Sequence, residues 1–227
     1  MGTDFSSIGD QIALVVDQLG QTLFTLNCSS DCSIYVDQAR HPVVPSVPSV
    51  DTFILYTGTG DCVVSGYYSS GPKVGSLPAW TTTIPACEAS EGVGGTYRCF
   101  EASDDGSTIA LLGYGKDDGN PNITSRAYAL DGQTGAIRWT YDLSIKQKEA
   151  AGQGDIWITT TGNFIAYINE DGFPDPNSAQ MHILNGNDGS LRSEVQIPFF
   201  IAGAISDDGN YVAIQNFTHL EGSQGRF

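Results

Sequence analysis

Three segments of this chain repeat one phrase, and the repeat limits the folds open to the chain. Each segment begins with a polar tetrapeptide that ends in glycine and continues with a short apolar run: residues 103–111, 159–167 and 206–214. With two weaker copies, the turn glycines are Gly9, Gly60, Gly106, Gly162 and Gly209. A spacing of about 50 residues between units that contain only strands is typical of a β-propeller, in which each unit is one four-stranded blade.

The residues of the repeated phrase fit a hairpin turn followed by a buried strand. Asp and Gly suit the tight turn between two antiparallel strands, because glycine tolerates the positive φ that such turns need. The apolar runs contain many β-branched and aromatic residues and do not alternate strictly with polar ones, as is typical of strands buried on both faces. We therefore expect an all-β fold built from four-stranded antiparallel blades.

The strand pattern predicts about four and a half blades within a single domain. We expect blades near residues 3–40, 50–86, 97–143 and 155–197, and an incomplete blade at 199–227. The proline-rich stretch 41–48 is predicted to be an extended connection between the first two blades. Because propellers commonly hold four to eight complete blades, the pattern favours part of a larger propeller, or a last sheet completed by strands from elsewhere.

One segment carries a tryptophan-docking motif. All five fixed positions of A-x-D-x-x-T-G-x-x-x-W are matched, by Ala129, Asp131, Thr134, Gly135 and Trp139. This segment resembles the docking repeat of quinoprotein dehydrogenases, and the chain is similar to the quinoprotein-like and WD40-like group of propellers. The resemblance implies that the Asp and the Thr-Gly pair build the turn between the third and fourth strands, and that the Trp packs between adjacent blades. The next copy keeps the turn but has Ser193 in place of the tryptophan.

The docking motif implies a blade and not an enzyme activity. Quinoprotein dehydrogenases hold a quinone with an acidic base, a calcium ligand set and often a Cys-Cys disulfide, and this chain shows no match to any of them. The G-x-S-x-G, G-x-G-x-x-G and P-loop patterns are also missing. The Asp-Asp pairs at 104–105 and 207–208 recur at one turn, so they are interpreted as hairpin residues. We expect no catalytic residue and no organic cofactor; a quinoprotein-type (PQQ-like) dehydrogenase is the alternative.

The charge of the chain limits its partners. There are 26 acidic residues against 10 basic ones, which gives a formal net charge of −16 at pH 7. Such a surface repels phosphate groups, so nucleic acid and anionic membranes are poor partners. No apolar run has the length of a membrane span, and the polar start of the chain shows no signal peptide. We therefore expect protein partners or self-assembly, without membrane insertion.

The five cysteines suggest an oxidising compartment. Cys28 and Cys32 flank a short turn, and Cys87 and Cys99 bracket a glycine-rich loop. We expect one disulfide within each of these pairs, which leaves Cys62 free and buried in a strand. Five reduced cysteines are the alternative.

Three N-x-S/T sequons support export. They begin at Asn27, Asn122 and Asn216, and all three are expected at strand ends or loops, where a glycan can lie in water. With the paired cysteines, they favour a glycoprotein of the extracellular space or the secretory lumen. The sequence therefore predicts a non-enzymatic propeller that binds partners or acts as a scaffold. An intracellular WD40-like interaction platform is a second alternative.

One acidic loop is a candidate calcium site. Asn169, Asp171 and Asp175 place oxygen ligands around a glycine, in a pattern that resembles the calcium loops of integrin-type propellers, D-x-D-x-D-G-x-x-D. Tyr167 stands where the first Asp of that pattern belongs. Calcium takes six to eight oxygen ligands, which the loop could offer in part through carbonyls and water. A solvated acidic turn is the alternative.

Overall fold

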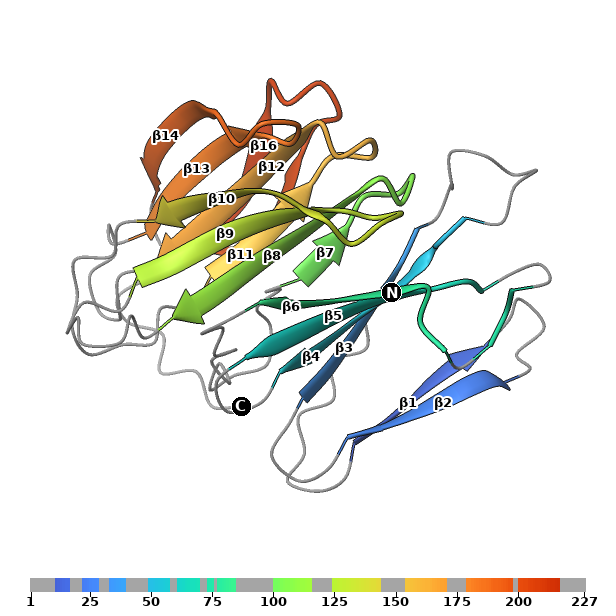
Figure 1. The fold of residues 1–227 in the computed structure, drawn as a ribbon. Coiled ribbons are helices and arrows are strands. Elements are labelled where there is room, and N and C mark those ends of the chain that lie inside the picture. The colour runs from blue at the N-terminus through green and yellow to red at the C-terminus, as the bar shows by residue number, and fades with distance from the viewer. Residues whose placement is uncertain are drawn as a thin grey trace, which may run out of the picture.

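The structure, a computed structural model, consists of strands and turns throughout the part that it describes. The described residues are 11–16, 22–28, 33–39, 49–57, 61–69, 73–75, 77–84, 100–115, 124–143, 154–170, 179–197 and 200–216. They contain sixteen strands and no helix (Figure 1). No helix in these segments is therefore long and apolar enough to cross a membrane.

The strands form five antiparallel sheets in chain order. Sheet one is the hairpin of β1 (Gln11–Val16) and β2 (Thr22–Cys28), and sheet five is the hairpin of β15 (Phe200–Ile205) and β16 (Val212–Asn216). Between them lie three four-stranded sheets. Sheet two contains β3 (Ser33–Gln38), β4 (Thr52–Thr57), β5 (Cys62–Tyr67) and β6 (Trp80–Ile84). Sheet three contains β7 (Phe100–Ala102), β8 (Thr108–Gly115), β9 (Thr124–Asp131) and β10 (Ile137–Leu143). Sheet four contains β11 (Gly154–Ile158), β12 (Phe164–Glu170), β13 (Ala179–Asn185) and β14 (Leu191–Ile197).

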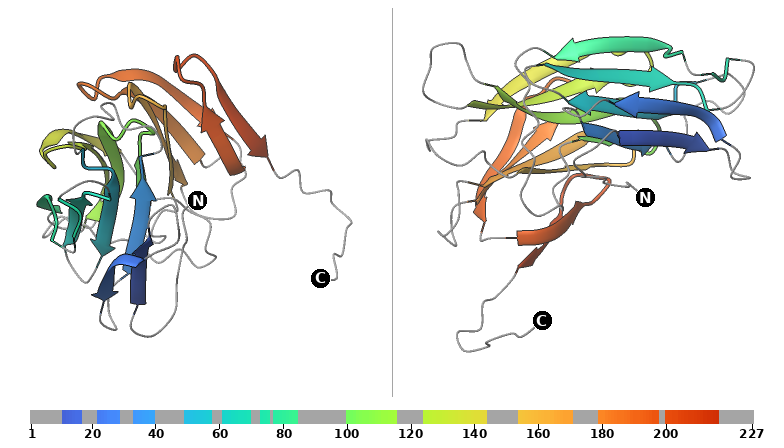
Figure 2. Two further views of the ribbon diagram at one scale, coloured as in Figure 1. Left: turned by 90° about the vertical axis from the view of Figure 1, so that its right-hand side faces the viewer. Right: turned by 90° about the horizontal axis from the view of Figure 1, so that it is seen from below.

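The sheets are arranged as successive blades of a partial β-propeller. Within each four-stranded sheet the strands pair in sequence order, so the first strand and the last strand lie at opposite edges. The first strands β3, β7, β11 and β15 contact one another in turn, which places them along the inner side of the arc (Figure 2). The expected fold class of four-stranded antiparallel propeller blades is confirmed.

The core lies between neighbouring sheets. Alternate residues of one strand serve two different junctions: Ile109 and Leu111 of β8 pack toward sheet two, whereas Ala110 and Leu112 pack toward sheet four. The second strand of sheet four behaves in the same way, with Tyr167 facing sheet three. Burial on both faces explains why these strands show no polar alternation in the sequence.

The repeated glycines lie at equivalent turns where the structure describes them. Gly106, Gly162 and Gly209 each separate the first strand of a sheet from the second, with φ of 68°, 66° and 65°. This conformation is costly for any residue with a Cβ, which accounts for glycine in all three copies. Gly9 and Gly60 are outside the described residues.

The boundary between the first two blades differs from the expected one. β3 pairs with β4 and therefore belongs to sheet two rather than to the unit at 3–40. The proline-rich stretch 41–48 thus joins two strands of one sheet, not two blades. Gly60 precedes β5, the third strand of its sheet, so this weak copy of the phrase is not equivalent to the strong ones. The long connection inside sheet two shifted the apparent repeat.

Candidate functional site: the turn rim and the tryptophan junctions

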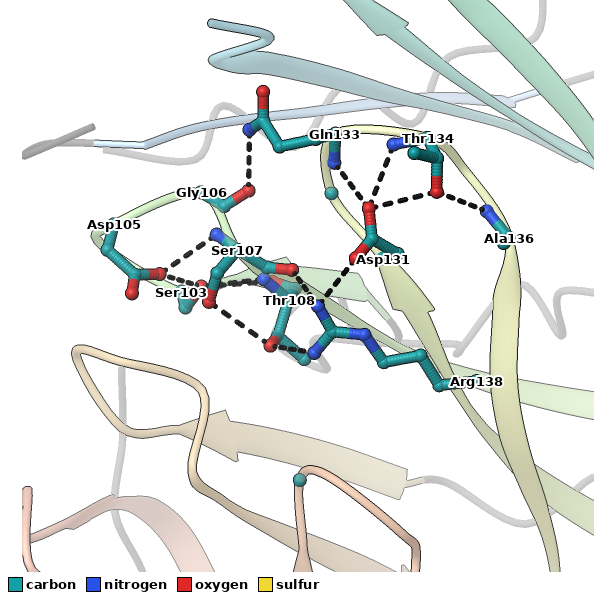
Figure 3. A network of polar contacts seen from close by, with 12 residues as sticks. Ser103, Asp105, Gly106, Ser107, Thr108, Asp131, Gln133, Thr134, Ala136 and Arg138 are labelled. Atoms are coloured by element: carbon teal, nitrogen blue, oxygen red, sulfur yellow. Dashed lines mark hydrogen bonds and ion pairs between the residues drawn. The ribbon is translucent and has the colours of Figure 1, made fainter. Parts of the chain in front are cut away.

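The turns between the first and second strands of sheets three and five are each closed by a carboxylate. In sheet three, Asp105 Oδ1 accepts hydrogen bonds from Ser103 Oγ at 2.7 Å and from the Ser107 backbone N–H at 2.9 Å (Figure 3). In sheet five, Asp208 Oδ1 accepts from Ser206 Oγ at 2.7 Å. Aspartate in such a turn satisfies a local backbone donor. The second aspartate of each Asp-Asp pair is therefore a turn residue.

Other carboxylates join neighbouring sheets. Three of them accept a hydrogen bond from a backbone N–H of an adjacent sheet: Asp37 from Ala102 at 2.7 Å, Glu101 from Ile158 at 3.2 Å, and Asp207 from Thr160 at 3.0 Å. Hydrogen bonds from Thr160 lower the pKa of Asp207 below its ordinary value. These three carboxylates therefore have a structural role between sheets.

The turn between the third and fourth strands of sheet three is built around Asp131. Its Oδ1 accepts from the backbone N–H of Gln133 at 3.0 Å, and from the N–H and Oγ1 of Thr134, both at 2.9 Å (Figure 3). Partial burial alone would raise the pKa of Asp131, but hydrogen bonds from Arg138 and Thr134 outweigh it and lower the pKa. Asp131 is therefore held as a carboxylate.

A β-bulge directs Arg138 into the same turn. The register between β9 and β10 shifts between Ile137 and Trp139, which leaves Arg138 as the extra residue. The guanidinium donates to Asp131 Oδ2 at 2.7 Å, and to Ser107 O and Thr108 Oγ1 at 2.9 and 3.0 Å. One arginine thus ties the two turns of sheet three together.

Trp139 joins sheet three to sheet four. Its Nε1 donates to the carbonyl oxygen of Gly186 at 2.9 Å, and the indole is 8% exposed. Gly189 lies against the ring with φ of 70°, and a Cβ placed there would come within 2.7 Å of an indole carbon. The turn of sheet four therefore receives the tryptophan of sheet three.

Trp80 forms an equivalent junction that the sequence motif does not reveal. Its Nε1 donates to Gly132 O at 3.1 Å, and a Cβ on Gly135 would come within 2.3 Å of its ring. The D-x-x-T-G turn of sheet three therefore receives Trp80 and not Trp139. The two halves of the motif serve different junctions, so a tryptophan can dock without the turn sequence preceding it. The glycine-containing turn of sheet three, one repeat after Trp80, is the sequence signal that could have identified this junction.

The junction between sheets four and five is made differently. Ser193 takes the position of the docking tryptophan, and the large aromatic contact comes instead from Trp157 in the first strand of sheet four. A Cβ on Gly203 in β15 would come within 2.1 Å of the Trp157 ring. This contact lies on the inner side of the arc, whereas the Trp80 and Trp139 contacts lie on the outer strands.

The expectation that Cys62 is free is wrong. Cys62, at the start of β5, is fully buried and disulfide-bonded, although it was expected to be free. Loop length in the sequence favoured the nearest pairs, but a sheet brings together residues that are distant in sequence.

The other predicted site residues fall at the limits of the described segments. Asn169 lies near the end of β12, whereas Asp171 and Asp175 are outside the described residues, so the calcium site stays a prediction. Asn27 lies in β2, and Asn216 is the last residue of β16. Asn122 is outside the described residues. Glycosylation likewise stays a prediction.

No family model matches this chain, and no curated protein matches it in sequence. Solved structures are similar in fold. The structure described as the Dos1 propeller superposes with a TM-score of 0.50 at 10% identity, over 89% of this chain and 47% of that chain. BamB from Moraxella catarrhalis has a TM-score of 0.47 at 14% identity, over 89% of this chain and 53% of that one. Hsv2 from Kluyveromyces lactis has a TM-score of 0.47 at 14% identity, over 89% of this chain and 51% of that chain.

These similarities bear on the fold alone. At this level of identity, the match to the Dos1 propeller supports a propeller architecture and carries no activity or ligand to this chain. The chain spans about half the length of these solved propeller chains. The class that the repeat, the sheets and the junctions define is the β-propeller.

Proposed function

We propose that this chain is a propeller module that binds or scaffolds protein partners in the extracellular space or the secretory lumen, without a catalytic role. The observation that carries the compartment is Cys62, which is fully buried and disulfide-bonded. Disulfides persist in oxidising compartments and are rare in the cytosol. The sequons at Asn27, Asn122 and Asn216 add support, because secretion would expose them to glycosylation.

The turn rim supports a binding role rather than catalysis. By turn rim we mean the turns at 103–107, 131–136, 159–163, 185–190 and 206–210. Asp105, Asp131 and Asp208, which as repeated acidic residues are the natural candidates for acid/base chemistry, are occupied in holding these turns. A rigid rim of this kind is a suitable platform for a partner surface. The net charge of −16 disfavours polyanionic partners.

Intact mass of the native protein tests the proposal. Treatment with a glycosidase should remove mass, and peptide mapping should locate the glycans at Asn122 and Asn216. Mapping without reduction should find Cys62 bridged to another cysteine of the chain. Unmodified asparagine at both positions together with a free Cys62 thiol in native material would contradict the compartment, and would favour the intracellular WD40-like platform.

A further inference from the structure

His182 of β13 is a buried titratable residue at the junction between sheets three and four. Its Nδ1 is shielded from solvent and has no hydrogen-bond partner among the described residues. Buried polar atoms are nearly always hydrogen-bonded, so an unpaired nitrogen of this kind needs an explanation. Neither the tryptophan contacts nor the turns use this side chain.

Three titratable side chains of the described strands face His182. Tyr141 of β10 covers it from sheet three, with the ring centres 5.8 Å apart and the ring planes at 56°. Tyr167 lies beside it on β12, and Glu194 lies beside it on β14. The Tyr167 hydroxyl donates to Tyr128 O at 2.8 Å, whereas Glu194 is exposed. None of these described groups accepts a hydrogen bond from the imidazole Nδ1.

A positive charge on His182 is poorly accommodated while the junction is closed. The residues of β9 that face this junction are Ala127 and Ala129, which carry no charge. Glu194 is the only carboxylate that the described strands place directly beside His182. Because Glu194 is exposed, water and salt screen its attraction for an imidazolium. Burial therefore lowers the pKa of His182, and Glu194 opposes this only in part.

The outer half of this junction is held by fewer contacts than the inner half. On the inner strands β11 and β12, Ile156 and Ile165 are fully buried against sheet three. The outer hairpin of β13 and β14 meets sheet three through the packing of Tyr141 on His182 and through the hydrogen bond that Trp139 donates to its turn. An opening that exposes His182 to water can therefore be confined to the outer hairpin.

We propose that His182 is a pH-sensitive contact whose protonation separates the outer hairpin β13–β14 from sheet three, while the inner strands keep their packing. The junction is closed above the ordinary histidine pKa of about 6.5, and it opens increasingly as the pH falls toward the lower pKa of the closed state. The turn at 185–190 belongs to this hairpin, so acid would alter the turn rim at sheet four. This regulation goes beyond the proposed function and does not depend on the compartment.

Exchange of the indole N–H groups with solvent, followed by nuclear magnetic resonance on the full chain, measures this opening. The Trp139 Nε1–H donates to Gly186 O in the turn of the outer hairpin, so opening of the hairpin releases it for exchange. The Trp80 Nε1–H makes the same kind of bond to Gly132 O at another junction, and it corrects for the pH dependence of exchange itself. Between about pH 7.5 and about pH 5.5, the ratio of the Trp139 rate to the Trp80 rate should rise several-fold, to at most about tenfold, because one proton is bound.

Three variants assign the effect to the imidazole. His182→Gln should remove the rise in the ratio, whereas His219→Gln, the matched change at another histidine, should retain it. Glu194→Gln should enlarge the rise, because the closed state then loses the carboxylate that partly compensates the charge on His182. The imidazole resonances of His182 in the parent chain should titrate below about pH 6.5.

Two results would overturn the proposal. One is a ratio that is the same at both pH values, whether the two indole rates stay constant or rise together. The other is a rise that persists in His182→Gln. If that variant does not fold, the parent chain decides, since a His182 pKa at or above about 6.5 excludes opening on protonation. Glycan and disulfide mapping do not depend on this junction, so failure here leaves the proposed compartment standing.

Discussion

The junction between sheets three and four and the junction between sheets four and five join similar sheets by different means. At the first, Trp139 reaches across the outer strands to the glycine turn of the next sheet. At the second, Ser193 stands in that position and Trp157 makes the aromatic contact on the inner side. The two junctions therefore differ in where the large aromatic contact lies, and Trp139 is the one that covers the outer strands. Val195 is left exposed at the junction where that tryptophan is missing.

Among the changes that test this contrast, removal of the Trp139 indole should have the largest effect on the free energy of unfolding. We expect Trp139→Ala to lower the free energy of unfolding by about 3–5 kcal/mol, because it empties a buried site and leaves Gly186 O without its donor. Ser193→Ala, the matched change in sheet four, should alter stability by less than about 0.5 kcal/mol. Urea unfolding of both variants measures the difference. An unchanged Trp139→Ala stability with loss of partner binding would place Trp139 in a binding surface instead.

The glycine that faces the indole should be next in importance. Gly189→Ala forces a side chain into a positive φ, at a typical cost of about 1–3 kcal/mol, and also displaces the Trp139 ring. The part of this stability cost that comes from displacing the ring should vanish when Trp139 is already replaced by alanine. A double-mutant cycle would detect this as a coupling energy between the two positions. Gly75→Ala is the control, since an added Cβ there meets no atom within 4 Å. Strict additivity of the two changes would show that the turn and the indole are independent.

The smallest expected effect is a pH dependence of stability, and it arises at the junction between sheets three and four. His182 is 5% exposed, its ring centre is 5.8 Å from that of Tyr141, and its Nδ1 has no hydrogen-bond partner among the described residues. Burial lowers the pKa of His182, and the nearby Glu194 carboxylate offsets this only in part. Tyr167 is its neighbour on β12, and Glu194 is its neighbour on β14.

The direction of the change in stability with pH follows because His182 binds a proton more readily in the unfolded chain than in the folded chain. Stability is therefore complete above the ordinary histidine pKa of about 6.5, and it decreases as the pH falls below that value toward the lower pKa of the folded state. His182→Gln should remove this decrease, whereas Tyr141→Phe should retain it. Urea unfolding on both sides of the histidine pKa is the measurement. The same loss of stability at low pH in His182→Gln and the parent would exclude His182 as the source.

The sequence predicted sheets three and four closely because their turns carry local signals. The turn glycines and aspartates act within a few residues, so the strand limits around Gly106 and Gly162 follow from short-range geometry. The failures depend on contacts between distant segments. β3 was assigned to the wrong sheet because a long connection separates it from β4, and pairing is not visible in local residue types. Trp80 and the bonded Cys62 were missed for the same reason, since their partners belong to other segments.

The divided tryptophan motif has a consequence for how such a chain can grow. One outer hairpin holds an indole donor for the following sheet and a glycine acceptor turn for the preceding one. Tandem duplication of a unit like sheet three would therefore create a new interface in which donor and acceptor already match. Lengthening of the propeller by such a duplication would then need no compensating mutation at the new interface. Sheet four has Ser193 in place of that donor, so a duplicate of sheet four would form an interface without the tryptophan contact.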